Sequence, residues 1–319
     1  MTKKSLNRGL NIKKLVIPLI FVIGLYVILP QFKTFRSSLH YLYHPNFAYF
    51  ILSALFMTGT FFAAALSYML FAKKRLRYFE ELFVQLSAIF VNQTLPAGIG
   101  GIGANYEYLK HKGHKSYQAA TVVAMNNLSG LIGHIIIVVT ALALFPPSKI
   151  LPIHISSNTS HVVRILLAIV IFAVLVFLFI GYRKIKKTIL NVAKQLITYE
   201  HNPKRTAVAL LSQMTLTLCY VFCLFYSSKA VGIHLSFVIT LIIFTFGNGL
   251  KNFSPTPGGL GGYEAALLAA FLAYNASTQQ ALAAVLLFRL ISYWIPLVLG
   301  LFSFIYTEKL GWYSDESAA

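Results

Sequence analysis

Long apolar stretches, separated by short polar and basic segments, run along the whole chain. A helix needs about 20 residues to cross a hydrocarbon core of about 30 Å, and six stretches are of that length. They are residues 15–32, 46–72, 117–145, 164–182, 206–228 and 278–306. The pattern predicts an all-α fold, that of a polytopic helical membrane protein with about six full spans.

Two further segments are apolar but are interrupted by glycine and proline. In residues 79–116, an apolar arm at about 80–97 leads into the glycine-rich residues 96–103 and then into a polar part that cannot span lipid. In residues 235–275, the interruption is residues 255–262. Irregular backbone at membrane depth is tolerated only where protein or a water-filled cavity covers it. We therefore predict two re-entrant helical hairpins with their apices at these interruptions.

The distribution of charge predicts which ends face the cytoplasm. The chain has 27 Lys and Arg, 8 Asp and Glu and a formal net charge of +19, but only 11% of its residues are charged and 57% are hydrophobic. The basic clusters in residues 1–14, 73–77 and 183–205 flank apolar spans, as in cytoplasmic loops. We expect a plasma membrane protein with both termini in the cytoplasm. Basic clusters that flank apolar spans argue against a nucleic acid partner, because such a partner is favoured by one dense basic face.

The two interruptions align with each other. Placing Pro96 on Pro257 superimposes residues 97–101 on 258–262, with small, Gly, branched aliphatic, Gly and Gly in register. We divide the single domain, 1–319, into a first repeat at about 46–145, a cytoplasmic connector at 183–205, and a second repeat at about 206–306. The connector is expected to be an amphipathic surface helix. Hairpins that enter from opposite faces make the repeats inverted, as in many secondary transporters, which bind substrate at the broken helices.

Two ionisable residues of the second repeat are candidates for substrate contact. Glu264 directly follows the second glycine turn, where the helix dipole also favours a carboxylate. Arg289 lies near the middle of the last span, where exposure to lipid would cost at least about 3 kcal/mol, so it must face protein, water or an anion. A structural pair between Glu264 and Arg289 and a phosphodiester site on Arg289 both remain open.

The other candidates for substrate contact lie in and after the glycine turns. Those of the first repeat are Asn92, Pro96, Gly100, Gly101 and Glu107, and those of the second are Pro257, Gly258, Gly259, Gly261 and Gly262. Weaker candidates are Lys110, Asn126, Asn127 and Lys251. Glycines in such turns permit tight bends and close approach of backbone to a helix or a ligand.

Catalytic and metal-binding patterns are missing from the sequence. Residues 98–103 fit the dinucleotide fingerprint literally, but they follow an apolar arm rather than a strand. No nucleophile, base and orienter can be assembled, and no Cys and His spacing suits a metal. Cys219 and Cys223 are expected to be buried as small hydrophobes. We therefore predict no enzyme activity, no cofactor and no metal.

The motifs around both turns resemble those of the lysylphosphatidylglycerol synthase transmembrane family, the flippase-like domain. Asn92-x-x-x-Pro96 with its glycine turn and residues 108–110 resembles the first family motif, although no Arg closely follows Gly101 and Ile102, as it does in many relatives. Residues 254–264, followed by residues 289–294, closely resemble the second motif. The likeness covers nearly the whole chain. The resemblance implies lipid translocation, described best for aminoacylated phosphatidylglycerol in multiple peptide resistance factors.

The leading functional hypothesis is a lipid translocase that moves an anionic or aminoacylated phospholipid, such as lysylphosphatidylglycerol, between leaflets. Relatives also carry a soluble synthetase domain, which is not found up to Ala319, so we do not expect synthesis from this chain. Two alternatives are a small-solute secondary transporter and a non-transporting membrane partner of a separate lipid-modifying enzyme. The expected partners are phospholipid head groups and the membrane. A homo-oligomer and a separately encoded enzyme are left open.

Overall fold

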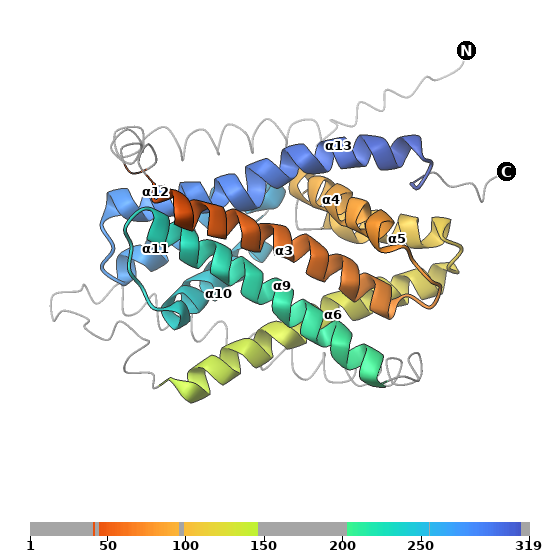
Figure 1. The fold of residues 1–319 in the computed structure, drawn as a ribbon, viewed down its shortest axis with the longest axis horizontal. Coiled ribbons are helices and arrows are strands. Elements are labelled where there is room, and N and C mark those ends of the chain that lie inside the picture. Colours follow the sequence, from red (N-terminus) through yellow and green to blue (C-terminus); the bar gives the residue numbers. More distant parts are fainter. Residues whose placement is uncertain (1–40, 42–44, 96–98, 146–202, 255, 314–319) are drawn as a thin grey trace, which may run out of the picture.

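The computed structural model describes residue 41 and residues 45–95, 99–145, 203–254 and 256–313. Within these ranges every regular element is a helix (Figure 1). The predicted spans 15–32 and 164–182, and the connector up to residue 202, lie outside the described residues. The prediction of an all-helical fold is confirmed for the described part of the chain.

Four helical segments in these ranges are long and apolar enough to cross a membrane. They are α3 (Phe47–Phe71), α6 (Ser116–Leu144), α9 (Pro203–Ala230) and the continuous segment Thr278–Lys309. The last segment consists of α12 (Thr278–Arg289), the single π-helical turn η4 (Leu290–Trp294) and α13 (Ile295–Lys309). Each coincides closely with a predicted span, so the chain is a multi-pass helical membrane protein.

Shorter helices form the two segments that were predicted as hairpins. The first contains α4 (Tyr78–Thr94) and α5 (Ile99–His111). The second contains α10 (Phe237–Phe253), the 3-10 turn η3 (Pro257–Gly259) and α11 (Gly262–Ala273). The stretches between these helices, 95–98 and 254–261, overlap the predicted interruptions 96–103 and 255–262.

The first break is shorter than the predicted apex. Residues 99–103 belong to the start of α5 instead of an irregular turn. Gly100 permits this packing, because a Cβ added there would collide with the carbonyl oxygen of Val91 near the end of α4. Gly100 therefore serves close helix approach rather than the turn itself.

Helices α3 and α9 run antiparallel and pack along each other (Figure 1). At one end, the backbone N–H of Asn46 donates to the carbonyl of Ala230 at 2.9 Å. At the other end, Nη2 of Arg205 donates to the carbonyls of Met69 and Ala72 at 2.9 and 2.8 Å. These carbonyls end α3 and have no partner within their own helix, so the contact from α9 satisfies them.

The middle of the same helix pair carries small polar side chains. The Ser53 hydroxyl donates to the carbonyl of Cys223 at 2.8 Å and contacts the Ser227 hydroxyl at 2.8 Å. Cys219 and Cys223 are free and buried, which confirms the prediction made for them. Small side chains let helices approach closely where no hydrophobic driving force acts between them.

Polar contacts join the two ends of the first hairpin. Nζ of Lys112, just after α5, lies 2.7 Å from a carboxylate oxygen of Glu80 in α4. The ring of His114 accepts a hydrogen bond from the backbone N–H of Lys74 at 3.2 Å and lies 3.0 Å from the carbonyl of Leu109. Burial lowers the pKa of His114, so the neutral ring can serve both contacts. The start of α4 and the end of α5 thus lie at the same end of the molecule.

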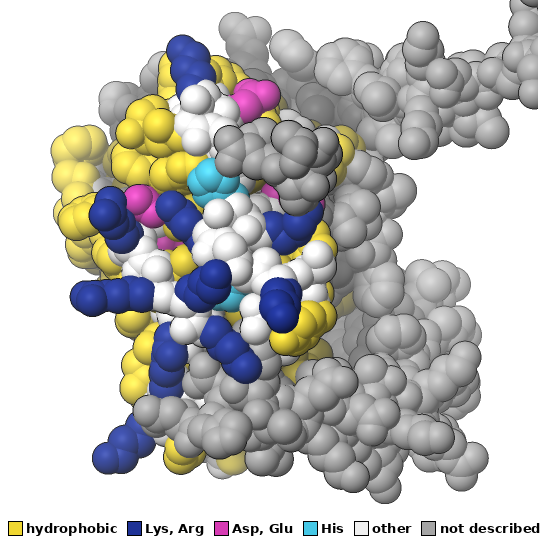
Figure 2. All heavy atoms as spheres, turned by 90° about the vertical axis from the view of Figure 1, so that its right-hand side faces the viewer, with side chains coloured by type: hydrophobic (Ala, Val, Ile, Leu, Met, Phe, Trp, Pro, Cys, Tyr) yellow, Lys and Arg dark blue, Asp and Glu magenta, His cyan; other side chains and the backbone are white. Residues whose placement is uncertain are grey.

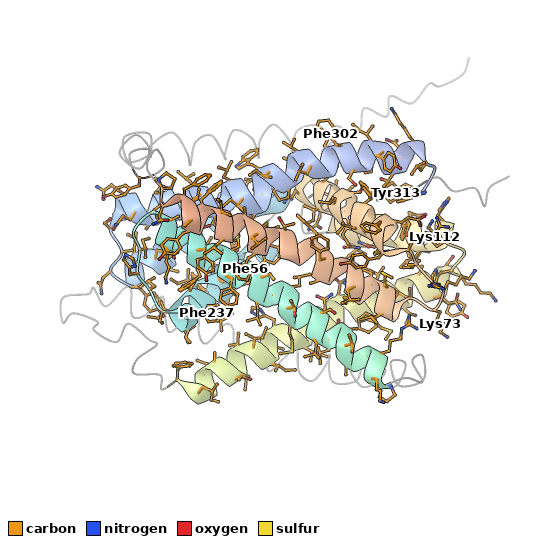
Figure 3. All side chains as sticks on the ribbon, in the orientation of Figure 1. Phe56, Lys73, Lys112, Phe237, Phe302 and Tyr313 are labelled. Atoms are coloured by element: carbon orange, nitrogen blue, oxygen red, sulfur yellow. The ribbon has the colours of Figure 1, made fainter. Side chains whose placement is uncertain are left out.

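This end of the molecule is strongly basic, and we call it the basic end. Figure 2 shows it as a surface crowded with Lys and Arg side chains, and Figure 3 places Lys73 and Lys112 there. Its basic residues lie where α3, α5 and α13 end and where α4, α6 and α9 begin. Of the described Lys and Arg residues, only Lys229, Lys251 and Arg289 lie elsewhere.

Close packing of α4 against α13 depends on Gly300. A Cβ added at Gly300 would lie 2.5 Å from the carbonyl oxygen of Leu86 and 2.9 Å from Cβ of Phe90. Beside this contact, the Ser87 hydroxyl donates to the Ser303 hydroxyl at 3.1 Å. The first hairpin is therefore fixed to the last helix of the chain through a glycine that leaves no room for a side chain.

Gly300→Ala should destabilise the protein by about 1–3 kcal/mol, because the added methyl group forces α4 away from α13. Gly103→Ala is the matched control, since an added Cβ there meets nothing within 4 Å. Both changes gain similar helix propensity, so their difference isolates the contact. The measurement is reversible unfolding of the purified protein in detergent. Equal stability of the two variants would show that α4 does not depend on this close approach.

Candidate functional site

Three glycines with positive φ shape the second helix break. The φ angles of Gly258, Gly259 and Gly261 are 58°, 73° and 84°. Only glycine adopts this backbone region without a steric penalty. A Cβ at Gly258 would also collide with the ring of Tyr293, and a Cβ at Gly259 would lie 2.7 Å from Cγ of Lys251. The turn is thus compact enough to lie directly against both side chains.

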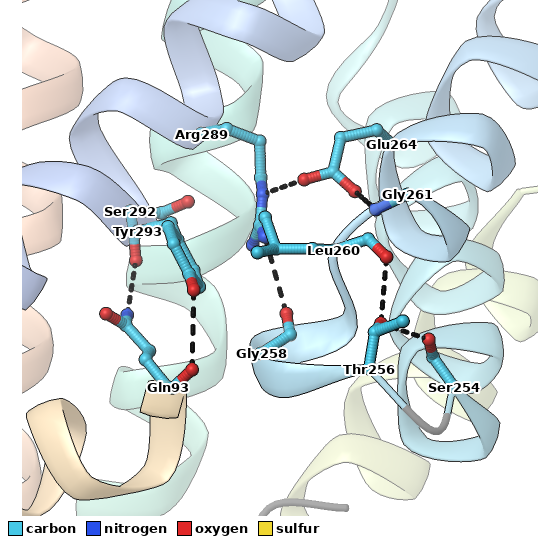
Figure 4. Close-up of polar contacts among 10 residues, drawn as sticks. All are labelled: Gln93, Ser254, Thr256, Gly258, Leu260, Gly261, Glu264, Arg289, Ser292 and Tyr293. Atoms are coloured by element: carbon cyan, nitrogen blue, oxygen red, sulfur yellow. Dashed lines mark hydrogen bonds and ion pairs between the residues drawn. The ribbon is translucent and has the colours of Figure 1, made fainter. Parts of the chain in front are cut away.

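Glu264 satisfies the start of α11. The backbone N–H of Gly261 donates to Oε2 of Glu264 at 2.7 Å (Figure 4). A carboxylate in the first turn also interacts favourably with the helix dipole. The sequence prediction of a first-turn carboxylate is confirmed, and the same carboxylate has a second partner.

That second partner is Arg289, the last residue of α12, which is only 3% exposed. Its Nε donates to Oε1 of Glu264 at 2.5 Å, and its Nη2 donates to the carbonyl of Gly258 at 3.3 Å (Figure 4). The guanidinium also lies 4.2 Å from the ring centroid of Tyr293. The predicted pair between Glu264 and Arg289 is present, and it joins α12 to both sides of the helix break.

A second cation approaches the same group of residues. Nζ of Lys251 in α10 lies 5.5 Å from the ring centroid of Tyr263, and the guanidinium carbon of Arg289 lies 5.4 Å from it. Two cations and one carboxylate thus meet around this ring. Such an excess of positive charge in a buried place favours an anion, and Arg in particular pairs well with phosphate oxygens.

The first hairpin reaches this site through Gln93. Its Nε2 donates to the carbonyl of Ser292 at 3.4 Å, and the Tyr293 hydroxyl donates to the carbonyl of Gln93 at 3.3 Å (Figure 4). Ser292 and Tyr293 belong to η4, and single π-helical turns of this kind occur often at functional sites. The end of α4 therefore touches the residue that packs on Arg289.

A cavity of about 250 Å³ lies on the other side of the first hairpin, between α3, α4, α5, α6 and α9. Its wall contains uncharged polar side chains from all five helices. They are Thr60, Tyr68, Gln85, Asn92, Asn105, Asn126, Asn127, Gln213 and Tyr220. Together with Gly101 and Ile102, they form a polar space beside the predicted first turn.

Hydrogen bonds order much of this wall. Oδ1 of Asn126 accepts bonds from Ser67 at 2.8 Å and from Nε2 of Gln213 at 2.6 Å, which links α3, α6 and α9. Oδ1 of Asn92 accepts a bond from the backbone N–H of Gly101 at 3.3 Å. Asn92 and Gly101 are thus brought together as wall residues, and so are Asn126 and Asn127, which had been weaker candidates.

The remaining candidates are spread over several places. Pro257 begins η3, and Gly262 begins α11, where its backbone faces Ser254. Glu107 pairs with Lys110 at 3.4 Å, and neither residue lines the cavity. Pro96 lies outside the described residues.

Several wall residues were missed by the sequence analysis. In α4, Glu81, Gln85 and Asn92 are spaced four and seven residues apart, which places them on one helix face. This polar stripe on an apolar arm is a signal that helical periodicity could have revealed. The contributions of Asn105 and Gln213 depend on which faces of α5 and α9 meet α4, and no pattern within one helix predicts that.

The fold and the two sites define a class of protein: a multi-pass helical membrane protein with polar and charged groups gathered at broken helices. A family model described as lysylphosphatidylglycerol synthase TM region matches residues 15–300, so the chain belongs to this family. This confirms the resemblance drawn from the two motifs. A search of curated proteins found no match.

Arg289→Gln should destabilise the protein by about 3 kcal/mol, because it leaves Glu264 without its cation. This value lies at the low end for a buried pair, since the Glu264 side chain is 24% exposed. The double variant Glu264→Gln with Arg289→Gln should lose less than the sum of the two single variants, because both charges are removed. The check is a double-mutant cycle measured by unfolding in detergent. Additive losses would mean that the pair does not stabilise the fold.

Proposed function

We propose that this protein moves phospholipids between the leaflets of the membrane. The observation that carries the proposal is the excess positive charge at the second helix break, where Arg289 and Lys251 meet the single carboxylate Glu264. An ionisable group at membrane depth is costly and usually serves transport or binding. The membership of the lysylphosphatidylglycerol synthase TM region family supports a role in lipid chemistry.

The chemistry of the second break suits a phosphodiester. A guanidinium carries five N–H donors in a planar fork, of which Nε and Nη2 contact Glu264 and Gly258. A phosphate oxygen that displaces the Gly258 carbonyl would gain a charge-assisted hydrogen bond. Glu264 would keep Arg289 in position during this exchange, so the structural pair and the anion site serve successive stages of one cycle.

The cavity in the first repeat offers room for the remainder of a head group. Ile102, which lines the cavity, is 44% exposed, and Asn127 is also an exposed wall residue. The wall therefore reaches the outer surface beside α5 and α6. A volume of about 250 Å³ accommodates a polar head group but not the acyl chains, which would stay in the bilayer.

The proposed orientation follows from the basic end, which we assign to the cytoplasm of a plasma membrane protein. The first hairpin then enters from the cytoplasm and the second from outside, so that the two repeats are inverted. Alternate exposure of the polar groups would follow from rocking of one repeat against the other. The contact of Gln93 with Tyr293 is where the first hairpin would move past the last span.

A second function, transport of a small water-soluble solute, is favoured by one observation. The polar side chains of the cavity wall are amides and hydroxyls, and none of the lining side chains is charged, which suits hydrogen bonding to neutral polar solutes. Such a transporter would take up solute without moving lipid, and it would be indifferent to the lipid head group.

Purified protein in proteoliposomes should exchange fluorescent phospholipid between leaflets faster than empty vesicles do. Arg289→Gln should slow this exchange about tenfold or more, because charge-assisted hydrogen bonds contribute about 1.5–3 kcal/mol each. Arg289→Lys should recover only part of the rate, since Lys lacks the planar fork. The exposed Lys309→Gln is the control and should match the wild type.

Rates equal to those of empty vesicles for every phospholipid tested would refute the proposed translocation. Uptake of a labelled sugar or amino acid by the same vesicles, without lipid exchange, would favour the solute transporter. Folding of each variant is checked by its elution from size exclusion and its melting temperature, so that a lost rate is not confused with lost protein.

The proposed orientation predicts which positions react with a membrane-impermeant maleimide in intact cells. Gln279→Cys, at the exposed start of α12, should react from outside, and Lys115→Cys, at the basic end, should react only after permeabilisation. Both are made in a background in which the buried Cys219 and Cys223 are replaced by Ala. Reaction of both positions from the same side would contradict the count of crossings and the inverted repeats.

A further inference from the structure

A carboxylate that the proposed translocation does not use lies buried in the first hairpin. Glu81 occupies the first turn of α4, next to the basic end and outside the four candidate spans, and it is 1% exposed. Oε1 of Glu81 accepts a hydrogen bond from Nε2 of Gln85 at 2.8 Å. Oε2 is buried and has no hydrogen-bond partner within the part of the chain that the structure describes. A buried carboxylate with an unpaired oxygen is costly in its ionised form.

No cation pairs with Glu81 among the described residues. Its neighbour Glu80 contacts Lys112 at 2.7 Å and Arg77 at 3.5 Å, so these two basic groups form ion pairs with Glu80 and not with Glu81. Lys112 also lies over the ring of Trp312 at 5.0 Å. The other titratable groups that face Glu81 are phenols: Tyr68 from α3, Tyr108 from α5 and Tyr313 after α13.

These surroundings change the acidity of Glu81. Burial raises its pKa to about 8, while the hydrogen bond from Gln85 and the charge of Lys112 act in the opposite direction. Glu80 adds to the increase, because its charge repels that of Glu81. The side chain is therefore mostly protonated at neutral pH and loses its proton as the pH rises through about 8.

Glu81 is connected to the cavity by an unbroken series of hydrogen bonds. Nε2 of Gln85, which donates to Glu81, also donates to Oδ1 of Asn105 at 2.7 Å. Nδ2 of Asn105 donates to the carbonyl of Gly101 at 2.8 Å, and the N–H of Gly101 donates to Asn92 at 3.3 Å. All four partners of this series line the cavity.

Protonation of Glu81 would alter this series at its first bond. The two hydrogens of the Gln85 amide serve Glu81 and Asn105, and the first of these bonds is charge-assisted only while Glu81 is ionised. A protonated carboxyl can itself donate a hydrogen bond. Its hydrogen bond from Gln85 is then no longer charge-assisted and is weaker. The described residues contain no cluster of three His, Cys, Asp or Glu side chains, so the site suits a proton better than a metal ion.

We propose that Glu81 is a proton-binding site whose protonation state controls the polar wall of the cavity and, through it, the rate of lipid movement. The second half of this inference rests on the proposed translocation. The protonated form is the faster one, because a neutral side chain can change its surroundings without the cost of moving a buried charge.

The test compares Glu81→Gln, which mimics the protonated form, with the wild type at equal pH on both sides of the vesicle membrane. Between roughly pH 7 and pH 9 the protonated fraction falls about tenfold, so the wild-type exchange rate of fluorescent phospholipid should fall by a similar factor. Glu81→Gln should be fast and independent of pH. The exposed Glu308→Gln is the matched control and should keep the wild-type profile. A flat wild-type profile, or an unchanged profile in Glu81→Gln, would overturn the coupling.

A second measurement is independent of transport. Because the folded-state pKa of Glu81 lies above its ordinary value of 4.5, its protonated form contributes stability that is complete below that value and is lost as the pH rises through about 8. The melting temperature of the wild type, relative to that of Glu81→Gln, should therefore fall between about pH 5 and about pH 8. His114 titrates below its ordinary pKa and is present in both proteins, so it cancels.

The two measurements separate two kinds of failure. If the wild type moves no lipid at any pH, but its melting temperature relative to Glu81→Gln falls as expected, the proton site stands and the proposed translocation fails. If the difference in melting temperature does not change with pH, the proton site itself is overturned, whatever the exchange rates show.

Discussion

A broken helix at membrane depth must give every freed backbone group a new partner, and the pair between Arg289 and Glu264 meets this demand at the second break. Glu264 accepts from the N–H of Gly261, and Arg289 donates to the carbonyl of Gly258. The carbonyl of Leu260 accepts from the Thr256 hydroxyl at 2.8 Å. One ion pair thus joins two helices and closes the turn. It also stabilises a guanidinium whose charge lipid alone would not stabilise.

The described part of the first hairpin contains no such ion pair beside its break. Its amides, Asn92 and Asn105, bind the two backbone groups of Gly101, and a cavity with an uncharged wall lies beside them. The two breaks therefore differ in chemistry despite their similar glycine patterns. The second break carries an excess of positive charge, whereas in the first hairpin the buried carboxyl of Glu81 lies away from the break, at the basic end of α4.

The sequence predicted the four spans that the structure describes and the position of both breaks, because apolar length and glycine content are local properties. It also predicted the partner of Arg289, since an apolar segment offers few counter-ions. It did not predict the cavity, which depends on the faces that α3, α5 and α9 turn toward α4. Glu107 was expected near the substrate because it follows the first turn, but α5 is helical there, and a residue two positions from Asn105 points to the opposite face.

The antiparallel pair of α3 and α9 has a mechanical consequence. Asn46 fastens it to Ala230 at one end, and Arg205 fastens it to Met69 and Ala72 at the other, with Ser53 tied to Cys223 between them. Two helices joined by hydrogen bonds at both ends and in the middle cannot slide past each other without breaking these bonds. The pair joins α3 of the predicted first repeat to α9 of the predicted second, so rocking of one predicted repeat against the other would leave this pair in place and move the helices around it.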